Sequence, residues 1–138
     1  MRPGLSFARR ALPWLWLLYC VASLLHFAHN AEHVADYPNL PGWLSRGDIY
    51  LAWCAVALVG IVGFALYARG RELLGLTVLA VYAALGFDGL LHYGRAPLSA
   101  HNVAMNTTIL TEVVAAGLLL LAIAALAAER LPRSAVRS

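Results

Sequence analysis

The hydrophobic residues of this chain are gathered into four long runs, which are separated by short segments rich in Pro, Gly and Arg. Each run is close to the ~20 residues that a helix needs to cross ~30 Å of hydrocarbon. None alternates with the period of two that a barrel strand shows, so the runs predict helices. We therefore expect an all-α four-helix transmembrane bundle that forms a single integral membrane domain over residues 1–138. The predicted spans are residues 11–33, 48–68, 72–93 and 105–128.

The composition supports the same class of protein. Hydrophobic residues make up 62% of the chain and charged residues 12%, against about 45–50% and about 25% in a typical soluble domain. The chain contains no Lys, so its positive side chains are all Arg, and ten arginines against seven acids give the net charge of +3. That charge is better explained by membrane topology than by a nucleic-acid surface. The lipid bilayer is thus the expected partner, and no nucleic acid is expected.

The arginines predict the orientation, because loops on the cytoplasmic side carry an excess of positive residues. Only Arg46 and Arg95 fall on one side of the predicted spans. We therefore expect a multi-pass protein of a bacterial-type inner membrane, with both termini cytoplasmic. Residues 1–23 also have the basic start and apolar centre of a signal peptide, but the apolar run continues past them into a His-bearing segment. The arginines on the predicted cytoplasmic side are Arg2, Arg9, Arg10, Arg69, Arg71, Arg130, Arg133 and Arg137.

All five histidines lie at or beyond the predicted non-cytoplasmic ends of the spans, and most of the acids do as well. Ionisable groups inside a membrane are costly, so they are candidates for function by default. The sequence thus predicts a histidine cluster that faces the periplasm. The histidines are His26, His29, His33, His92 and His101, and the acids are Glu32, Asp36, Asp48, Asp88 and Glu112.

Helical spacing brings several of these side chains to common faces and depths. Residues 26–33 hold three histidines and Asn30 within an arc of about 100°. Asp88 and His92 are four residues apart, so they are expected on one face of the third span. At ~1.5 Å per residue, His29, Asp88 and Glu112 all lie about 24–26 Å from the cytoplasmic ends. The pattern therefore predicts that three helices bring imidazole and carboxylate groups to one level.

Neutral imidazole and carboxylate groups together suit transition metals such as Cu, Zn or Fe. Glu112 is expected to act as a general acid or base, or as a further ligand. The distance between His26 and His33 along the helix means that not all ligands can surround one ion. The predicted ligands are His26, His29, His33, Asp88 and His92, with Glu32, Asn30, His101, Asn102 and Met105 in supporting positions.

The function that these residues predict is a metal-dependent membrane enzyme, an oxidoreductase or hydrolase, that acts on a small or lipidic substrate. One alternative is a b-type haem protein for electron transfer, in which His26 or His29 pairs with His92 as axial ligands. Gly86 and Gly89 would then let the flat ring approach. The other alternative is a non-catalytic subunit for metal handling or transport. Because four short helices make a thin bundle, we also expect a homodimer or a larger membrane complex.

Two short motifs resemble known metal sites. Asp88, His92 and the more distant His101 resemble the membrane copper ligands of particulate methane monooxygenase, which implies copper. The histidines and Glu32 of residues 26–33 are similar to the histidine boxes of membrane desaturases and hydroxylases, although those enzymes use more boxes and face the cytoplasm. The chain also contains a short internal repeat, since residues 24–27 resemble residues 90–93. This repeat predicts a duplicated two-helix hairpin in which His26 and His92 face a shared centre.

Overall fold

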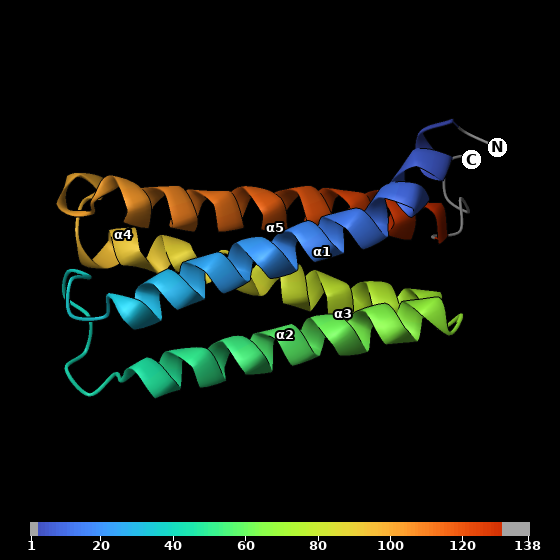
Figure 1. The fold of residues 1–138 in the computed structure, drawn as a ribbon. Helices are drawn as coiled ribbons and strands as arrows, with labels where there is room; N and C mark the ends of the chain where they lie inside the picture. The colour runs from blue at the N-terminus through green and yellow to red at the C-terminus, as the bar shows by residue number, and fades with distance from the viewer. Residues whose placement is uncertain (1–2, 131–138) are drawn as a thin grey trace, which may run out of the picture.

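The computed structural model describes residues 3–130 of the chain, and the side chains of residues 7–128. It is an elongated bundle in which α1 begins and α5 ends at the same end (Figure 1). We call this the terminal end, and we call the opposite end, which holds segments 33–45 and 96–102, the loop end. The elements are α1 (Pro3–Glu32), α2 (Arg46–Ala68), α3 (Glu72–Leu85), the 3-10 turn η1 (Asp88–Leu90), α4 (Leu91–Arg95), the 3-10 turn η2 (Leu98–Ala100) and α5 (Val103–Arg130).

Four stretches are long and apolar enough to cross a membrane, and the part of the chain that the structure describes contains no strand. The prediction of an all-helical, multi-pass membrane bundle is thereby confirmed. The side of the membrane on which the termini lie, and the duplication, stay predictions. Arg2, Pro132, Arg133 and Arg137 lie outside the described residues, as does the side chain of Arg130. The candidate spans are Phe7–Glu32, Arg46–Ala68, Glu72–Arg95 and Val103–Ala128.

The third span is built from three helical pieces rather than one continuous helix. Helix α3 ends at Leu85, and after Gly86 the chain continues as η1 and α4. Gly86 lies in tight contact with its neighbours, because a Cβ there would be 2.6 Å from Tyr19 Cε2 and 2.7 Å from Ala116 Cβ. The small residue therefore lets this span approach both α1 and α5. The loop-end part of the span, which carries Asp88 and His92, follows directly after this contact.

The helices pack around an apolar core that runs along the bundle. Helix α1 packs mainly against α5, and α2 packs mainly against α3. The rings of Tyr19 and Tyr82 lie 4.5 Å apart at the centre, and Leu79 and Leu119 are fully buried beside them. Large apolar side chains also cover the outside, as with Leu121, which is 69% exposed. An apolar exterior of this kind is what lipid requires of a membrane bundle.

Polar contacts organise the chain at the loop end. Ser45 caps α2 in a capping box: its hydroxyl accepts from the Asp48 N–H at 3.3 Å, and its own N–H donates to the Asp48 carboxylate at 2.9 Å. Asn39 adopts a left-handed backbone conformation with φ of 57°, and its amide donates to the Arg95 carbonyl oxygen at 2.8 Å. The α1–α2 loop is thus tied to the end of α4, above the buried histidines.

Candidate functional site

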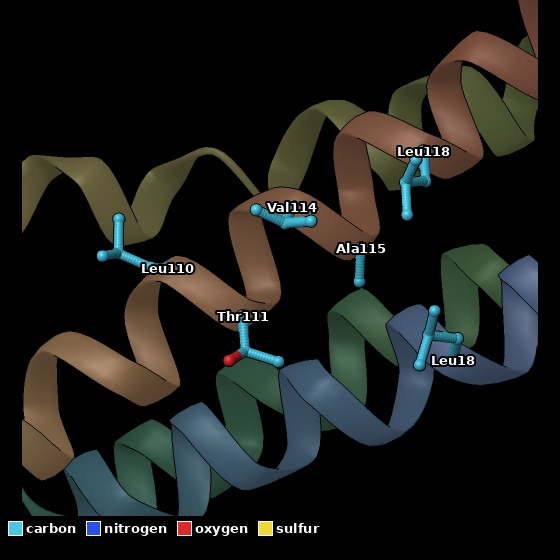
Figure 2. A pocket seen from close by; sticks show the side chains of 6 residues that line it. All are labelled: Leu18, Leu110, Thr111, Val114, Ala115 and Leu118. Atoms are coloured by element: carbon cyan, nitrogen blue, oxygen red, sulfur yellow. The ribbon is translucent and has the colours of Figure 1, made fainter.

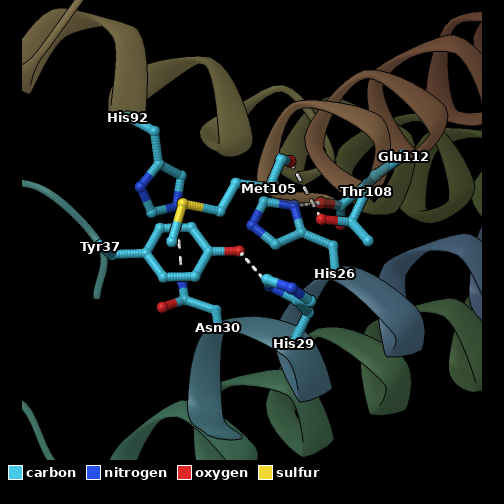
Figure 3. A network of polar contacts seen from close by, with 8 residues as sticks. All are labelled: His26, His29, Asn30, Tyr37, His92, Met105, Thr108 and Glu112. Carbon is cyan, nitrogen blue, oxygen red and sulfur yellow. Dashed lines mark hydrogen bonds and ion pairs between the residues drawn. The ribbon is translucent and has the colours of Figure 1, made fainter. Parts of the chain in front are cut away.

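The centre of the site is a buried pair formed by His26 on α1 and Glu112 on α5. His26 Nδ1 lies 2.7 Å from Glu112 Oε2, and the two side chains are only 3% and 0% exposed (Figure 3). The contact has the length of a charge-assisted interaction, although the ring and the carboxyl group are not aligned as in an ideal hydrogen bond. Ser23, also buried, lies beside the same carboxyl group. A carboxyl group in this position can hold the proton of His26 on Nδ1.

Helix α4 brings a second buried histidine to His26. The ring centroids of His92 and His26 are 5.4 Å apart, and the rings are tilted by 40°. His92 Nε2 lies 3.4 Å from the amide nitrogen of Asn30 on α1, whereas its Nδ1 has no hydrogen-bond partner. The rings of His26 and His92 therefore lie next to each other.

Gly86 and Gly89 could have left space for a flat cofactor, but side chains of the protein fill the space beside them. The space next to Gly86 is filled by the Tyr19 ring. At Gly89, a Cβ would lie 3.1 Å from His26 Cε1, so this glycine lets η1 approach the His26 ring. At both glycines, a ring of the protein itself lies where the haem plane was predicted to approach.

His29 of α1 and His33 are directed away from this pair. His29 Nδ1 lies 2.9 Å from the Tyr37 hydroxyl. His33 follows the end of α1 and is exposed, with its Nδ1 3.3 Å from Asp36 Oδ2. Tyr37 lies outside the spans, and burial raises the pKa of its phenol to about 12. The phenol therefore stays protonated over the physiological range and can donate to His29.

Tyr37 was missed by the sequence analysis, although it closes the site from above. It is 3% exposed and packs against Met105 and Ile109 of α5. Its ring centroid is 4.9 Å from that of His92. The only signal in the sequence was an aromatic residue in a loop rich in Pro and Gly, close to the histidines. Spacing along a helix cannot reveal a contact that a loop makes by folding back.

A cavity of about 160 Å³ adjoins the buried pair at the loop end. It reaches His26 and His92 on its histidine side, and the acidic residues that line it are Asp48 from the first turn of α2 and Asp88 from η1. Glu112 does not line it. The residues most relevant to chemistry in its wall are His26, Phe27, Asn30, Asp48, Asp88 and His92.

The supporting residues from the sequence analysis have mostly local structural contacts. Glu32 is 2.7 Å from Arg46 and accepts a hydrogen bond from Tyr50 at 2.8 Å. The Asn102 side chain accepts from the Met105 N–H at 2.9 Å at the start of α5. Of this set, Asn30 alone lines the cavity. Glu32 and Asn102 instead stabilise the helix ends around it.

His101 lies near His92 but is bonded elsewhere. Its ring centroid is 6.1 Å from that of His92, and its Nδ1 lies 3.1 Å from the Pro97 carbonyl oxygen. Its Nε2 is buried without a partner. His101 therefore supports the wall behind His92 and does not reach the cavity.

The predicted metal ligands do not converge on a single point. Among residues whose side chains are described, no three His, Cys, Asp or Glu groups are arranged to hold a metal ion. His26, His92 and Asp88 share one cavity, while His29 and His33 are directed to Tyr37 and Asp36. The metal ligand set as a whole therefore stays a prediction, and the buried pair and the cavity are the stronger features.

A second hollow lies on the outer surface between α1 and α5 (Figure 2). Its volume is about 300 Å³, and its wall is apolar except for a threonine hydroxyl. Such a groove suits lipid chains and offers no group for chemistry. It is lined by Leu18, Leu110, Thr111, Val114, Ala115 and Leu118.

Comparison with known proteins finds no matching family model, no matching curated protein and no matching solved structure.

Proposed function

We propose that this protein is a multi-pass membrane enzyme in which His26 transfers a proton to or from a small molecule, or the headgroup of a lipid, held in the loop-end cavity. The observation that carries the proposal is the 2.7 Å contact between His26 and Glu112, both buried. Buried acid–base pairs of this kind are enriched at functional sites. In this proposal the termini are cytoplasmic and the cavity opens towards the periplasm.

The two members of the pair have different roles. His26 lines the cavity and Glu112 does not, so His26 is the group that can meet a substrate. Glu112 lies behind it and is a positioning residue: it keeps the Nδ1 proton in place and leaves Nε2 as the base. A proton removed from the substrate would rest on His26 Nε2, and Glu112 would stabilise the imidazolium that forms. This differs from the role predicted from the sequence, in which Glu112 itself meets the substrate.

The proposal can be tested before the substrate is known. Wild-type protein, His26→Gln and His33→Gln would each be reconstituted into liposomes, incubated with a bacterial lipid and metabolite extract, and compared by mass spectrometry. We expect a conversion with wild type and His33→Gln that falls by roughly 10²–10⁴-fold with His26→Gln, the usual contribution of a general acid or base. His33 is the matched control because it is an exposed histidine outside the cavity. Identical product profiles for all three proteins would refute the enzymatic role.

The positioning role of Glu112 has its own spectroscopic signature. Nitrogen NMR of protein labelled on its histidine rings distinguishes a protonated from an unprotonated ring nitrogen. In wild type we expect His26 to carry its proton on Nδ1, and we expect Glu112→Gln to change that signal. A His26 signal that is the same in both proteins would show that Glu112 does not determine which ring nitrogen of His26 carries the proton.

A transition-metal site is the second candidate, and one arrangement favours it. His26 and His92 face each other with ring centroids 5.4 Å apart, and a carboxyl group stands behind His26. Carboxylate–histidine–metal arrangements orient ligands in this way. Water or a second copy of the chain would complete the coordination. Elemental analysis and a visible spectrum test it: His92→Ala should lower bound Cu, Zn or Fe by at least about tenfold, and His101→Ala should lower it less. Equal metal content in both variants would remove this candidate.

A further inference from the structure

We propose that His29 and His33 together form a binding site for a divalent transition-metal ion, such as Cu²⁺ or Zn²⁺, at the loop end of α1. The geometry that points to it is a pair of imidazole rings one helical turn apart, with ring centroids separated by 4.6 Å. Neither histidine lines the loop-end cavity. The inference therefore goes beyond the proposed function and does not depend on it.

The two rings project from the same side of a continuous helical turn. Helix α1 ends at Glu32, but the His33 N–H still donates to the His29 carbonyl oxygen at 3.0 Å. Helical geometry therefore extends to His33, and residues four apart on a helix are neighbours on its surface. Two histidines at this spacing can hold Zn²⁺ from a single helix. The ring planes are tilted by only 30°, so the rings already lie side by side.

His33 is oriented by a carboxylate. Its Nδ1 lies 3.3 Å from Asp36 Oδ2. Because an ionised carboxylate can only accept, the neutral ring carries its proton on Nδ1 and its lone pair on Nε2. Metal-binding histidines usually have their other ring nitrogen bonded in this way. His33 is exposed, and its Nε2 makes no hydrogen bond to any described side chain, so this nitrogen is open to an ion.

His29 has a similar support from the α1–α2 loop. Its Nδ1 lies 2.9 Å from the Tyr37 hydroxyl (Figure 3). A hydroxyl can donate or accept, and the Tyr37 hydroxyl lies beside that of Thr108. Thr108 gives its own proton to the Met105 carbonyl oxygen at 3.0 Å, so it can accept from Tyr37. Tyr37 can therefore accept the Nδ1 proton of His29 when a metal ion takes the lone pair on Nε2.

The chemistry of the two rings selects the class of ion. Neutral imidazole suits Cu²⁺ and Zn²⁺, whereas Mg²⁺ prefers oxygen ligands. Among the residues whose side chains are described, no third His, Cys, Asp or Glu joins the pair as a ligand, so water completes the coordination. Glu32, which lies between the two histidines in the sequence, is instead 2.7 Å from Arg46. With only two protein ligands, we expect the ion to bind reversibly.

The test is a Cu²⁺ titration of full-length protein without a purification tag, in an uncharged maltoside detergent, after metal has been stripped with EDTA. Calorimetry measures the affinity, and electron paramagnetic resonance detects the nitrogen ligands. We expect coordination by two imidazole nitrogens, with Zn²⁺ bound more weakly than Cu²⁺. His29→Gln and His33→Gln should each weaken Cu²⁺ binding by at least about tenfold. His101→Gln is the matched control and should leave it unchanged, because His101 is a loop-end histidine bonded to the Pro97 carbonyl oxygen.

A further variant tests the support of His29 rather than a ligand. Tyr37→Phe keeps the aromatic ring but removes the oxygen that accepts the His29 Nδ1 proton. It should weaken Cu²⁺ binding by about tenfold, as the loss of a group that orients a ligand does. Tyr93→Phe is the matched control, since it removes a hydroxyl at the same end that is bonded to Asn106. An equal effect of the two variants would show that Tyr37 does not orient His29, and would overturn the arrangement proposed here.

Four other results would overturn the inference: no Cu²⁺ binding, unchanged binding by His29→Gln or His33→Gln, an equal loss with His101→Gln, or Mg²⁺ binding of equal strength. Loss of Cu²⁺ with His92→Gln but not with His29→Gln would also overturn it, and would favour a metal at the buried histidines. Circular dichroism checks the fold of each variant. If His29→Gln does not fold, His33→Gln decides the matter, because His33 is exposed and follows the end of α1.

The inference and the proposed function can fail separately. Protein stripped with EDTA should keep the His26-dependent conversion, because neither His29 nor His33 lines the cavity. Cu²⁺ binding that depends on His29 and His33, without any conversion, would overturn the acid–base proposal alone. Conversion without Cu²⁺ binding would overturn the metal inference alone.

Discussion

The pairing of His26 with Glu112 predicts a large energetic coupling that a double-mutant cycle can measure. The perturbations are His26→Leu, Glu112→Leu and the double variant. The proposed role leaves His26 neutral until it takes up a proton, so the 2.7 Å contact pairs a buried imidazole with a buried carboxyl group. Each single replacement leaves the other group buried without its polar neighbour, which costs about 1–3 kcal/mol.

The double variant should be far less destabilised than the sum of the two single variants, because it leaves neither polar partner behind. We expect a coupling energy of about 2 kcal/mol or more, within the range seen for residues in direct contact. The assay is the free energy of unfolding, measured by steric trapping in bicelles or by SDS titration followed by circular dichroism.

The same cycle on Arg46 and Glu32 is the matched control. This pair is also 2.7 Å apart, but its side chains are 65% and 43% exposed. Its coupling should therefore be only about 0–1 kcal/mol, as for surface ion pairs. Burial is thus the main difference between the two cycles. If the effects of His26→Leu and Glu112→Leu simply add, the two groups do not act as a pair, and the basis of the proposed site is lost.

Three further predictions follow from other parts of the molecule. Reporter fusions in the turn at 69–71 should read cytoplasmic and fusions in the loop at 37–42 periplasmic, because of the arginine asymmetry; the reverse pattern would turn the cavity to the cytoplasm. Gly86→Ala should destabilise the bundle by about 1–3 kcal/mol through overpacking. Gly94→Ala should be near neutral, because a Cβ at Gly94 meets nothing within 4 Å. Equal stabilities of the two variants by SDS titration would contradict the close approach at Gly86. Tyr37→Ala should increase hydrogen exchange in the loop at 37–42, while Tyr37→Phe, which keeps the ring packed, should change it much less; equal exchange in both variants would mean that ring packing does not hold the loop.

Local features of the sequence were sufficient to predict the class of the fold. The length and apolarity of a span are properties of a single segment, and lipid imposes them on each segment separately. The depth of a side chain along a helix is likewise local, since each residue adds ~1.5 Å. The sequence therefore predicted four spans and the gathering of the histidines at one end. It also predicted that Glu112 would lie level with His29 and Asp88, whereas in the structure Glu112 contacts His26.

The direction in which each side chain points depended on how the helices pack. His26, His29 and His33 share one face by spacing, yet they have three different partners in the structure: Glu112, Tyr37 and Asp36. Those partners come from another helix and from a loop, and no periodicity within residues 26–33 could identify them.

Close approach between helices was the other feature that only the tertiary structure decided. The glycines of the third span could be read as space for a cofactor, but Tyr19 fills the place beside Gly86 and His26 the place beside Gly89. A glycine in a span indicates that another group packs closely against the backbone, but the sequence does not identify that group. The pairing of His26 with Glu112 and the cavity beside it therefore belong to the packed bundle, because they exist only where α1, η1, α4 and α5 meet.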